Sequence, residues 1–296
     1  MSSFSSTAVA FILRKTGIFK RMFSGGDYVT KNLAKLRATA SAPAAKWHKR
    51  VDVTQTVFEG RQVYHFTPKA GAAKGCLLYF HGGGYVYTAS ALHWDFLGHL
   101  AHVHGIRVIA PLYPLAPEVH IDAIVDFGVA LYRDALKTYD AGDVVIGGDS
   151  AGGGLTVSTI AAARAQGLPT PAGAVLICPW LHAGAPHPDQ LEIDPRDPIL
   201  SVKGIRSIGT LLAPGRDVDD PLLSPINADL SDFPPTLMFG GGDDILVSDA
   251  RALKAKLPDI EYHEAKRQMH VWPVFFFPES RGAQAQIAAF VKRVTG

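Results

Sequence analysis

Ser150 lies in a G-x-S-x-G pattern that runs from Gly148 to Gly152 as GDSAG. An apolar run, 144–146, leads into the pattern, and a helix-like stretch, 155–165, follows it. A serine on so tight a turn between a strand and a helix projects from the backbone as a nucleophile, and the small glycines leave room for the turn. The N-terminus of the following helix points to the same place and favours negative charge there. The pattern therefore predicts nucleophilic catalysis by Ser150.

A second motif, HGGGY at residues 81–85, directly follows the apolar run 76–80. Three consecutive glycines lose much conformational entropy on folding, so a requirement on the backbone must maintain them. An oxyanion hole is such a requirement, because bare N–H groups must approach a substrate oxygen. We predict that the amides of Gly82, Gly83 and Ala151 form this hole. A phosphate-binding loop is excluded because its lysine and spacing are absent.

A serine nucleophile needs a base, and the base needs an acid that orients it. Behind a nucleophile turn of this kind the expected chain order is serine, acid, histidine. Two carboxylates, Asp243 and Asp244, follow the apolar run 236–239, and their spacing does not distinguish them. His270 lies beyond the next expected strand, whereas His263 falls inside it. We predict His270 as the general base, with Asp243 or Asp244 as the orienting acid.

Other conspicuous side chains near these motifs receive structural interpretations. Asp149 flanks the nucleophile but should point away from it, and Glu118 precedes the serine, against the order expected of a triad acid. Tyr85, Trp180 and Trp272 are expected near the site, as lining of the substrate pocket or as part of the core. The chemistry needs no cofactor, and no metal site is predicted. Four histidines on one helical stretch are expected to pack or face solvent: His93, His99, His102 and His104.

The composition is that of a globular enzyme with one main domain. The chain has 296 residues, of which 47% are hydrophobic and 19% are charged, enough for one large core. The formal net charge of +2 is too small to indicate a nucleic-acid partner. Only two cysteines occur, Cys76 and Cys178, each in an apolar run. They are interpreted as reduced core residues, which suits a cytoplasmic location.

We expect neither a signal peptide nor a membrane span in the N-terminal segment, because its apolar run 8–13 is too short and basic residues follow at once. Residues 7–23 instead have an amphipathic pattern. We expect this stretch to pack over the mouth of the active site. Weak contact with a membrane surface is the alternative. The sequence also allows a homodimer.

Beyond residue 45, strand-like and helix-like segments alternate, which predicts a mostly parallel sheet with helices on both faces. The expected strands are 54–57, 62–67, 75–81, 107–111, 143–148, 174–179, 236–240 and 260–264. The expected helices are near 90–104, 119–139, 151–166, 247–257 and 279–294. The first two strands are close enough for a hairpin. A proline-rich region around 181–220 has little strand signal and is interpreted as an insertion over the carboxyl end of the sheet.

Taken together, the motifs resemble those of the hormone-sensitive-lipase-like esterases, the bacterial family IV carboxylesterases of the α/β-hydrolase fold. The resemblance covers roughly residues 75–295 and rests on HGGGY at 81–85, YPLAPE at 113–118, GDSAGGGL at 148–155, DPLLSP at 220–225, GGDDILVSD at 241–249 and MHVWPVF at 269–275. Pro114 departs from the family, in which arginine is more frequent at that position. Residues 1–45 match nothing firmly.

The resemblance implies an α/β-hydrolase fold with a catalytic domain over 46–296. A helical cap would form from residues 1–45 and from the insertion around 181–220. In the family the catalytic acid heads a D-x-L pattern, which favours Asp244 over Asp243. The resemblance also implies short acyl chains and small alcohols rather than long triglycerides.

We therefore expect a serine carboxylester hydrolase that acts on a small-molecule ester through Ser150, His270 and Asp244. Its kcat/KM should rise with pH as His270 loses its proton, near the unperturbed pKa of about 6.5. An amidase, an arylformamidase or a deacetylase of an acetylated natural product could use the same machinery. A non-catalytic ligand-binding protein on this fold is the more distant alternative, and such proteins tend to lose triad members.

Overall fold

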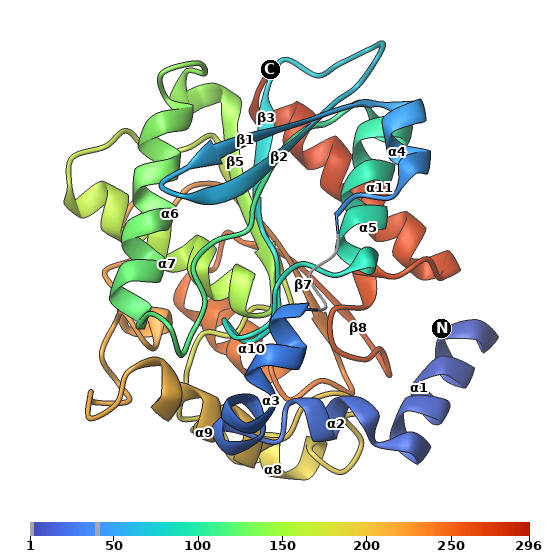
Figure 1. Ribbon diagram of the computed structural model, residues 1–296, viewed down its shortest axis with the longest axis vertical. Coiled ribbons are helices and arrows are strands. Elements are labelled where there is room, and N and C mark those ends of the chain that lie inside the picture. Colours follow the sequence, from blue (N-terminus) through green and yellow to red (C-terminus); the bar gives the residue numbers. More distant parts are fainter. Residues whose placement is uncertain (1–2, 39–41) are drawn as a thin grey trace.

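A single mixed sheet forms the centre of the computed structural model, which describes residues 3–38 and 42–296 (Figure 1). Its eight strands have the order β1-β2-β4-β3-β5-β6-β7-β8. β1 with β2 and β2 with β4 are antiparallel pairs, and all other neighbours are parallel. The strands are β1 (Asp52–Phe58), β2 (Arg61–Thr67), β3 (Cys76–Phe80), β4 (Arg107–Pro111), β5 (Val144–Asp149), β6 (Gly173–Ile177), β7 (Thr236–Gly241) and β8 (Glu261–Ala265). The mostly parallel sheet predicted from the alternation of elements is confirmed.

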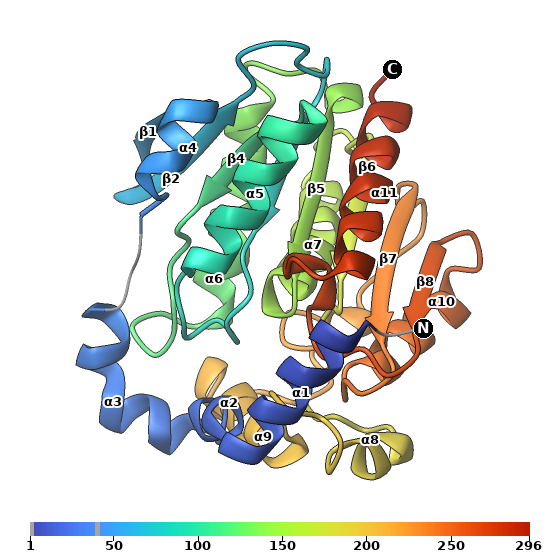
Figure 2. The ribbon, with the colours of Figure 1, turned by 90° about the vertical axis from the view of Figure 1, so that its right-hand side faces the viewer.

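Helices cover both faces of the sheet, so the central strands are buried throughout. Successive residues of β3 alternate between two cores: Leu78 contributes to one and Leu77 to the other. In Figure 2, α5 and α11 lie in front of the sheet, with α6 and α7 behind it. The helices that flank the sheet are α4 (Ala45–Arg50), α5 (Ala91–His104), α6 (Ile121–Ala135), α7 (Ala151–Ala165), α10 (Val247–Lys256) and α11 (Pro278–Val294). Three short 3₁₀ turns complete this part, at Ala141–Asp143, Pro225–Asn227 and Trp272–Val274.

The predicted hairpin joins β1 to β2 through a two-residue turn. Glu59 and Gly60 both have positive φ, 46° and 73°, and Phe58 pairs with Arg61 across the turn. Two left-handed residues in succession match the right-handed twist of the strands they connect. The hairpin thus sets the antiparallel end of the sheet, remote from the predicted motifs.

Five further helices lie beyond the carboxyl ends of the parallel strands, at the bottom of Figures 1 and 2, and we call them the edge helices. They are α1 (Phe4–Thr16), α2 (Ile18–Met22), α3 (Gly26–Ala38), α8 (Pro188–Ile193) and α9 (Val202–Leu212). The N-terminal and the inserted helices are tied together: Gly26 N–H donates to Ser207 Oγ at 2.9 Å, and Lys20 forms an ion pair with Asp194 at 2.8 Å. Residues 1, 2 and 39–41 of the expected N-terminal segment lie outside the described residues.

The amphipathic stretch expected over 7–23 is not one helix. Gly17 has φ of 58°, caps α1 and starts α2 in a new direction. Phe19, Met22 and Phe23 of the second piece turn towards the sheet edge, whereas Phe11 of the first is exposed. In the described part of the chain, no helix has the length and the apolar content needed to cross a bilayer.

Candidate active site

Ser150 occupies the turn between β5 and α7 with backbone angles that few residues adopt, φ 54° and ψ −121°. The turn is held from both sides, because Ser150 N–H donates to Ile177 O at 2.9 Å and Trp180 N–H donates to Ser150 O at 2.9 Å. A Cβ on Gly152 would lie 2.0 Å from Phe80 O, so only glycine fits there. Strain of this kind at a functional position is maintained by the structure around it.

The side chains of Ser150, His270 and Asp244 form one hydrogen-bonded chain. His270 Nδ1 lies 2.8 Å from Asp244 Oδ2, and His270 Nε2 lies 2.9 Å from Ser150 Oγ. A carboxylate only accepts, so Nδ1–H donates to Asp244, and Nε2 is left to accept the proton of the Ser150 hydroxyl. All three side chains are buried. The arrangement can remove a proton from the serine oxygen and keep it within the site.

Asp243 and Asp244, which the spacing could not distinguish, have different surroundings. Asp244 is fully buried, and its second oxygen, Oδ1, accepts from Leu246 N–H at 2.9 Å. Asp243 faces Arg196 instead, with 3.4 Å between Oδ1 and the arginine Nε. Only Asp244 is in a position to orient His270.

The electrostatics of His270 result from two opposing effects. Burial by itself lowers the pKa of His270, but the charge and the hydrogen bond of Asp244 outweigh it, and the net pKa is raised above 6.5. Asp197 and Asp149 act in the same direction as Asp244. The histidine is therefore a stronger base than the unperturbed residue assumed from the sequence.

The amide of Gly82 is not free to hold an oxyanion, contrary to our prediction. Gly82 N–H donates to Asp149 Oδ1 at 2.9 Å, and a Cβ on Gly82 would lie 2.2 Å from Asp149 Oδ2. The first glycine of HGGG thus fixes the loop, and the prediction for Gly82 is wrong. The acceptor of the Gly82 N–H, Asp149, lies 67 positions later in the chain, so the local motif cannot reveal it.

The amides of Gly83, Gly84 and Ala151 have no acceptor among the described residues. Ala151 begins α7, and the first N–H groups of a helix have no partner inside it. Gly83 and Gly84 have φ of 119° and 63°, a region that favours glycine. The amide of Gly84 was not among the donors predicted from the sequence. Its signal was the third glycine of the motif, to which no role had been given.

Asp149 fixes the loop after β3, residues 81–85, which we call the oxyanion loop after its predicted role. Its Oδ1 accepts from Tyr79 Oη–H at 2.7 Å as well as from Gly82 N–H, and its Oδ2 lies 3.3 Å from His93 Nε2. Burial alone would raise the pKa of Asp149, but His93 and Tyr79 outweigh burial and lower it. The structural interpretation of Asp149 fits these contacts. That of Glu118 fits too, since Glu118 forms an ion pair with Arg37 of α3 at 2.8 Å.

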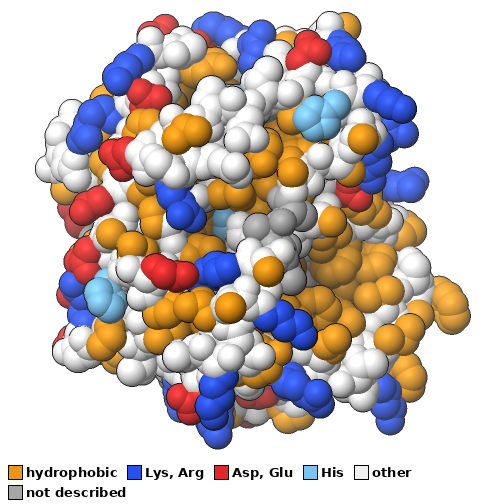
Figure 3. Space-filling model, viewed as in Figure 1, with side chains coloured by type: hydrophobic (Ala, Val, Ile, Leu, Met, Phe, Trp, Pro, Cys, Tyr) orange, Lys and Arg blue, Asp and Glu red, His pale blue; other side chains and the backbone are white. Residues whose placement is uncertain are grey.

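A cavity of about 450 Å³ opens beside Ser150 and His270. Its walls are mostly apolar and come from α2, from the loop between α8 and α9, from the loop after β3 with the start of α5, and from the segment after His270. Members of this lining include Phe19, Met22, Phe23, Tyr87, Leu92, Ile199, Val274 and Phe275. Figure 3 shows hydrophobic side chains gathered on the right of the molecular surface, over α1 and the region above it. The cavity thus suits an apolar group attached to a carbonyl that reaches Ser150.

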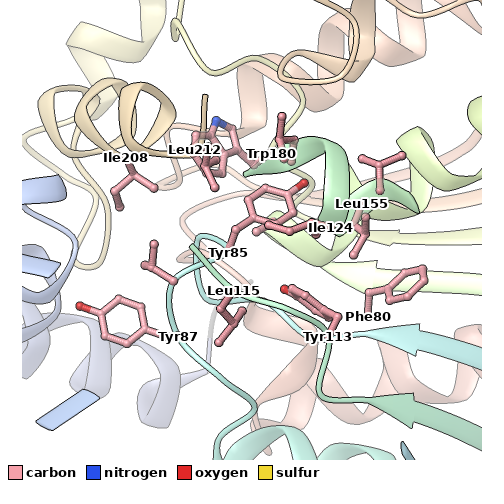
Figure 4. Packing of buried hydrophobic residues seen from close by; sticks show 14 of the residues in the cluster. Phe80, Tyr85, Tyr87, Tyr113, Leu115, Ile124, Leu155, Trp180, Ile208 and Leu212 are labelled. Atoms are coloured by element: carbon pink, nitrogen blue, oxygen red, sulfur yellow. The ribbon is translucent and has the colours of Figure 1, made fainter. Parts of the chain in front are cut away.

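Tyr85, Trp180 and Trp272 do not line this cavity, so the expectation that they line the pocket is wrong; they are core residues, as the alternative has it. Tyr85 lies between Trp180 and Tyr113 in the buried core (Figure 4), at ring distances of 5.9 and 6.4 Å. The space for Tyr85 is provided by Gly154, where a Cβ would lie 2.9 Å from the tyrosine hydroxyl. Trp272 is buried on the other face of the sheet, and its Nε1–H donates to Gly240 O at 3.1 Å.

One group of potential metal ligands occurs among the described residues, formed by Cys178, Asp244 and His270, whose ligand atoms lie within 4.8 Å of one another. Both ring nitrogens of His270 already have partners in the chain. Burial and the nearby carboxylate of Asp244 raise the pKa of Cys178, so its thiol keeps its proton. The geometry accordingly matches a proton relay rather than a ligand set.

Comparison with known proteins places these features in a wider context. The α/β-hydrolase-fold family matches residues 77–274. An acetyl-hydrolase of Streptomyces hygroscopicus is 35% identical over 228 residues, which cover 74% of this chain and 76% of that protein. An esterase of Acinetobacter venetianus is 30% identical over 231 residues, 74% of this chain and 75% of its own.

Solved structures give the same result. The structure of an esterase from the bacterial hormone-sensitive lipase family is 31% identical, has a TM-score of 0.78 and covers 90% of this chain and 98% of its own. A hormone-sensitive-lipase homologue from a metagenome library is 27% identical with a TM-score of 0.84, and the match covers both chains completely.

Proposed function

The chain belongs to the hormone-sensitive-lipase-like esterases of the α/β-hydrolase superfamily, and on that premise we propose that it is a serine carboxylester hydrolase acting through Ser150, His270 and Asp244. The observation that supports these roles most directly is the hydrogen-bonded chain from Asp244 Oδ2 through His270 to Ser150 Oγ, with links of 2.8 and 2.9 Å. The three side chains occur in the order that a nucleophile on such a turn requires.

In the proposed mechanism, Ser150 Oγ attacks the ester carbonyl carbon while its proton passes to His270 Nε2. The carbonyl oxygen becomes an oxyanion and accepts from the amides of Gly83, Gly84 and Ala151. Asp244 stabilises the imidazolium without taking its proton. The carbon–oxygen bond to the alcohol then breaks, and the alcohol leaves with the proton from His270. Water deacylates the serine by the same route, so that the acid is released and the enzyme is regenerated.

The substrates that we propose are small esters with short acyl chains, acetyl esters among them. The relatives named acetyl-hydrolase and esterase support this class, as does an apolar cavity of about 450 Å³. We also propose that the N-terminal segment and the insertion around 181–220 form a cap, because Phe19, Phe23 and Ile199 from these segments line the cavity.

The triad assignment is tested by covalent labelling and by kinetics. An organophosphonate should label the wild type and not Ser150→Ala, and this substitution should lower kcat by about 10⁶-fold. Asp244→Asn should lower kcat by about 10⁴-fold because the imidazole loses its orienting acceptor. The neighbouring Asp243→Asn is the matched control and should retain nearly full activity, since Asp243 faces Arg196.

A wild type that resists labelling would revive the non-catalytic alternative. A series of p-nitrophenyl esters from acetate to octanoate, run beside the matched anilides, determines the acyl preference. Faster hydrolysis of an anilide than of its ester would replace the esterase assignment with that of an amidase.

A weak contact with anionic membrane surfaces is a second proposal about partners, separate from the chemistry. It is supported by exposed apolar side chains on α1 and α2 and by the basic residues of the same helices.

A further inference from the structure

Asp197 is a fully buried carboxylate in the loop between α8 and α9, outside the proposed triad. Its Oδ1 accepts from the backbone N–H groups of Ile199 and Leu200, each at 2.8 Å, and its Oδ2 accepts from Ile245 N–H at 2.9 Å. A buried charged group is stable only when its hydrogen-bonding capacity is used in this way. Three backbone donors therefore converge on one carboxylate from two segments far apart in the sequence.

These two segments are the wall of the cavity and the loop of the catalytic acid. Ile199 lines the cavity beside Ser150. Ile245 directly follows Asp244, whose Oδ1 is bonded to Leu246 N–H at 2.9 Å and whose Oδ2 is bonded to His270. The loop that carries Asp244 is thus anchored to Asp197 through the N–H of the following residue, Ile245.

The charge of Asp197 also reaches His270. The ionisable side chains that act on His270 come from three elements: Asp244 after β7, Asp197 between α8 and α9, and Asp149 at the end of β5. The protonated thiol of Cys178, after β6, lies within 4.8 Å of the Asp244 and His270 ligand atoms. Arg196 and Asp243, which directly precede Asp197 and Asp244 in the chain, form an ion pair with 3.4 Å between Arg196 Nε and Asp243 Oδ1.

Asp197 itself is under opposing influences. Burial and then the charge of Asp244 raise the pKa of Asp197 to about 7, while His270 and the backbone donors act in the opposite direction. The proton occupancies of Asp197 and His270 are consequently coupled in the neutral pH range, where a serine hydrolase must keep its histidine neutral.

We propose that Asp197 is a positioning residue for the relay: its carboxylate fixes the loop that holds Asp244 and joins that loop to the cavity wall at Ile199. The inference rests on the proposed function, because it assigns a role relative to Ser150, His270 and Asp244.

Asp249 provides a matched control in the same region. It is also fully buried, and its Oδ2 accepts from Leu181 N–H at 2.9 Å and His182 N–H at 3.0 Å, at the start of the same insertion. Burial raises the pKa of Asp249 to about 7 as well. Its contacts, however, do not include the backbone next to Asp244, and the largest effects on the pKa of His270 come from Asp244, Asp197 and Asp149 instead.

The experiment compares Asp197→Asn with Asp249→Asn. Asparagine has the same shape, but it removes the charge and turns one acceptor into a donor that faces a backbone N–H. Asp197→Asn should lower kcat tenfold or more with little change in KM, because the reacting groups lose their alignment while the cavity that binds the substrate is kept. The loss of a negative charge lowers the pKa of His270, so the acid limb of kcat/KM should move to lower pH by roughly half a unit or more. Asp249→Asn should leave this limb in place.

A measurement on the wild type keeps the proposal testable if Asp197→Asn does not fold. In an NMR titration, the carboxyl carbon of Asp197 and the imidazole of His270 should share a titration step. An acid limb that is unchanged in folded Asp197→Asn, an equal shift in Asp249→Asn, or independent titration of the two groups would each overturn the proposal. A wild type without esterase activity would instead refute the proposed function.

Discussion

At the scale of single residues, the reactivity of the site is set by how negative charge is distributed around His270. Burial disfavours the imidazolium, and one directly bonded carboxylate with two further ones more than compensates. Ser150 needs the opposite state, a neutral imidazole, before it can lose its proton. The same charges that stabilise the transition state therefore narrow the pH range in which the free enzyme is ready to react.

The pH profile of the wild type follows from this balance. Because the pKa of His270 is raised, the base is protonated and inactive at low pH, and kcat/KM should rise through an apparent pKa above 6.5. The measurement is kcat/KM for a neutral ester from pH 5 to 9 in a pH-stat, with circular dichroism as the control for folding. A midpoint at or below 6.5 in folded protein would contradict the charge balance described for His270.

At the scale of elements, the turn between β5 and α7 is positioned by close backbone contacts that exclude side chains. The carbonyl of Phe80, at the end of β3, occupies the place that a Cβ on Gly152 would need. The oxyanion loop after β3 and the nucleophile turn after β5 are thus in direct contact, since β3 and β5 are neighbours in the sheet. Glycine is required at this contact, whereas a glycine inside an exposed helix with free space around it only weakens that helix.

Two alanine substitutions test this contrast. Gly152→Ala should lower the free energy of unfolding by about 1–3 kcal/mol, because its Cβ meets backbone that cannot move aside. Gly282→Ala, in the exposed interior of α11 with no atom within 4 Å of the added Cβ, should raise it by about 0.5–1 kcal/mol. Urea unfolding of the two variants and the wild type measures both values. Equal effects of the two substitutions would show that the contact at Phe80 is not a constraint.

At the scale of the whole molecule, the sequence motifs predict the sheet and place Ser150 and His270 beyond the carboxyl ends of its parallel strands. The structure brings His270 Nε2 to 2.9 Å from Ser150 Oγ, and the expectations that fail have identifiable causes. Gly82 was misassigned because its amide is used by Asp149, and Tyr85 because an aromatic residue beside a motif does not reveal which side of the loop it faces. Contacts between segments distant in the chain decide both cases.

The N-terminal helices α1 and α2 combine exposed apolar side chains with basic ones. Their most exposed apolar residues are Phe4, Phe11, Ile12 and Ile18. Arg14, Lys15 and Arg21 lie among them, and no acidic residue precedes Asp27 in the sequence. An amphipathic, basic surface of this type suits an anionic bilayer.

The membrane contact is tested by sedimentation with vesicles of phosphatidylglycerol and phosphatidylcholine. Phe11→Ser/Ile12→Ser should abolish binding, and Arg14→Gln/Lys15→Gln should weaken it about thirtyfold, since each cation contributes about 1 kcal/mol. Val57→Ser, at an equally exposed apolar position on β1, is the control and should bind like the wild type. Absence of vesicle binding, together with a wild-type dimer that Phe11→Ser/Ile12→Ser converts to monomer, would assign this face to a second copy of the chain.

The contacts of Asp197 have a consequence for how this enzyme can be changed. Ile199, in the cavity wall, and Ile245, beside the catalytic acid, are held by the same carboxylate. A redesign that shifts the backbone at 199 to admit a bulkier ester therefore also shifts the support of Asp244. A variant with a changed substrate range should therefore also have a changed pH dependence of activity. Variants selected in the laboratory for one of these properties should be screened for the other.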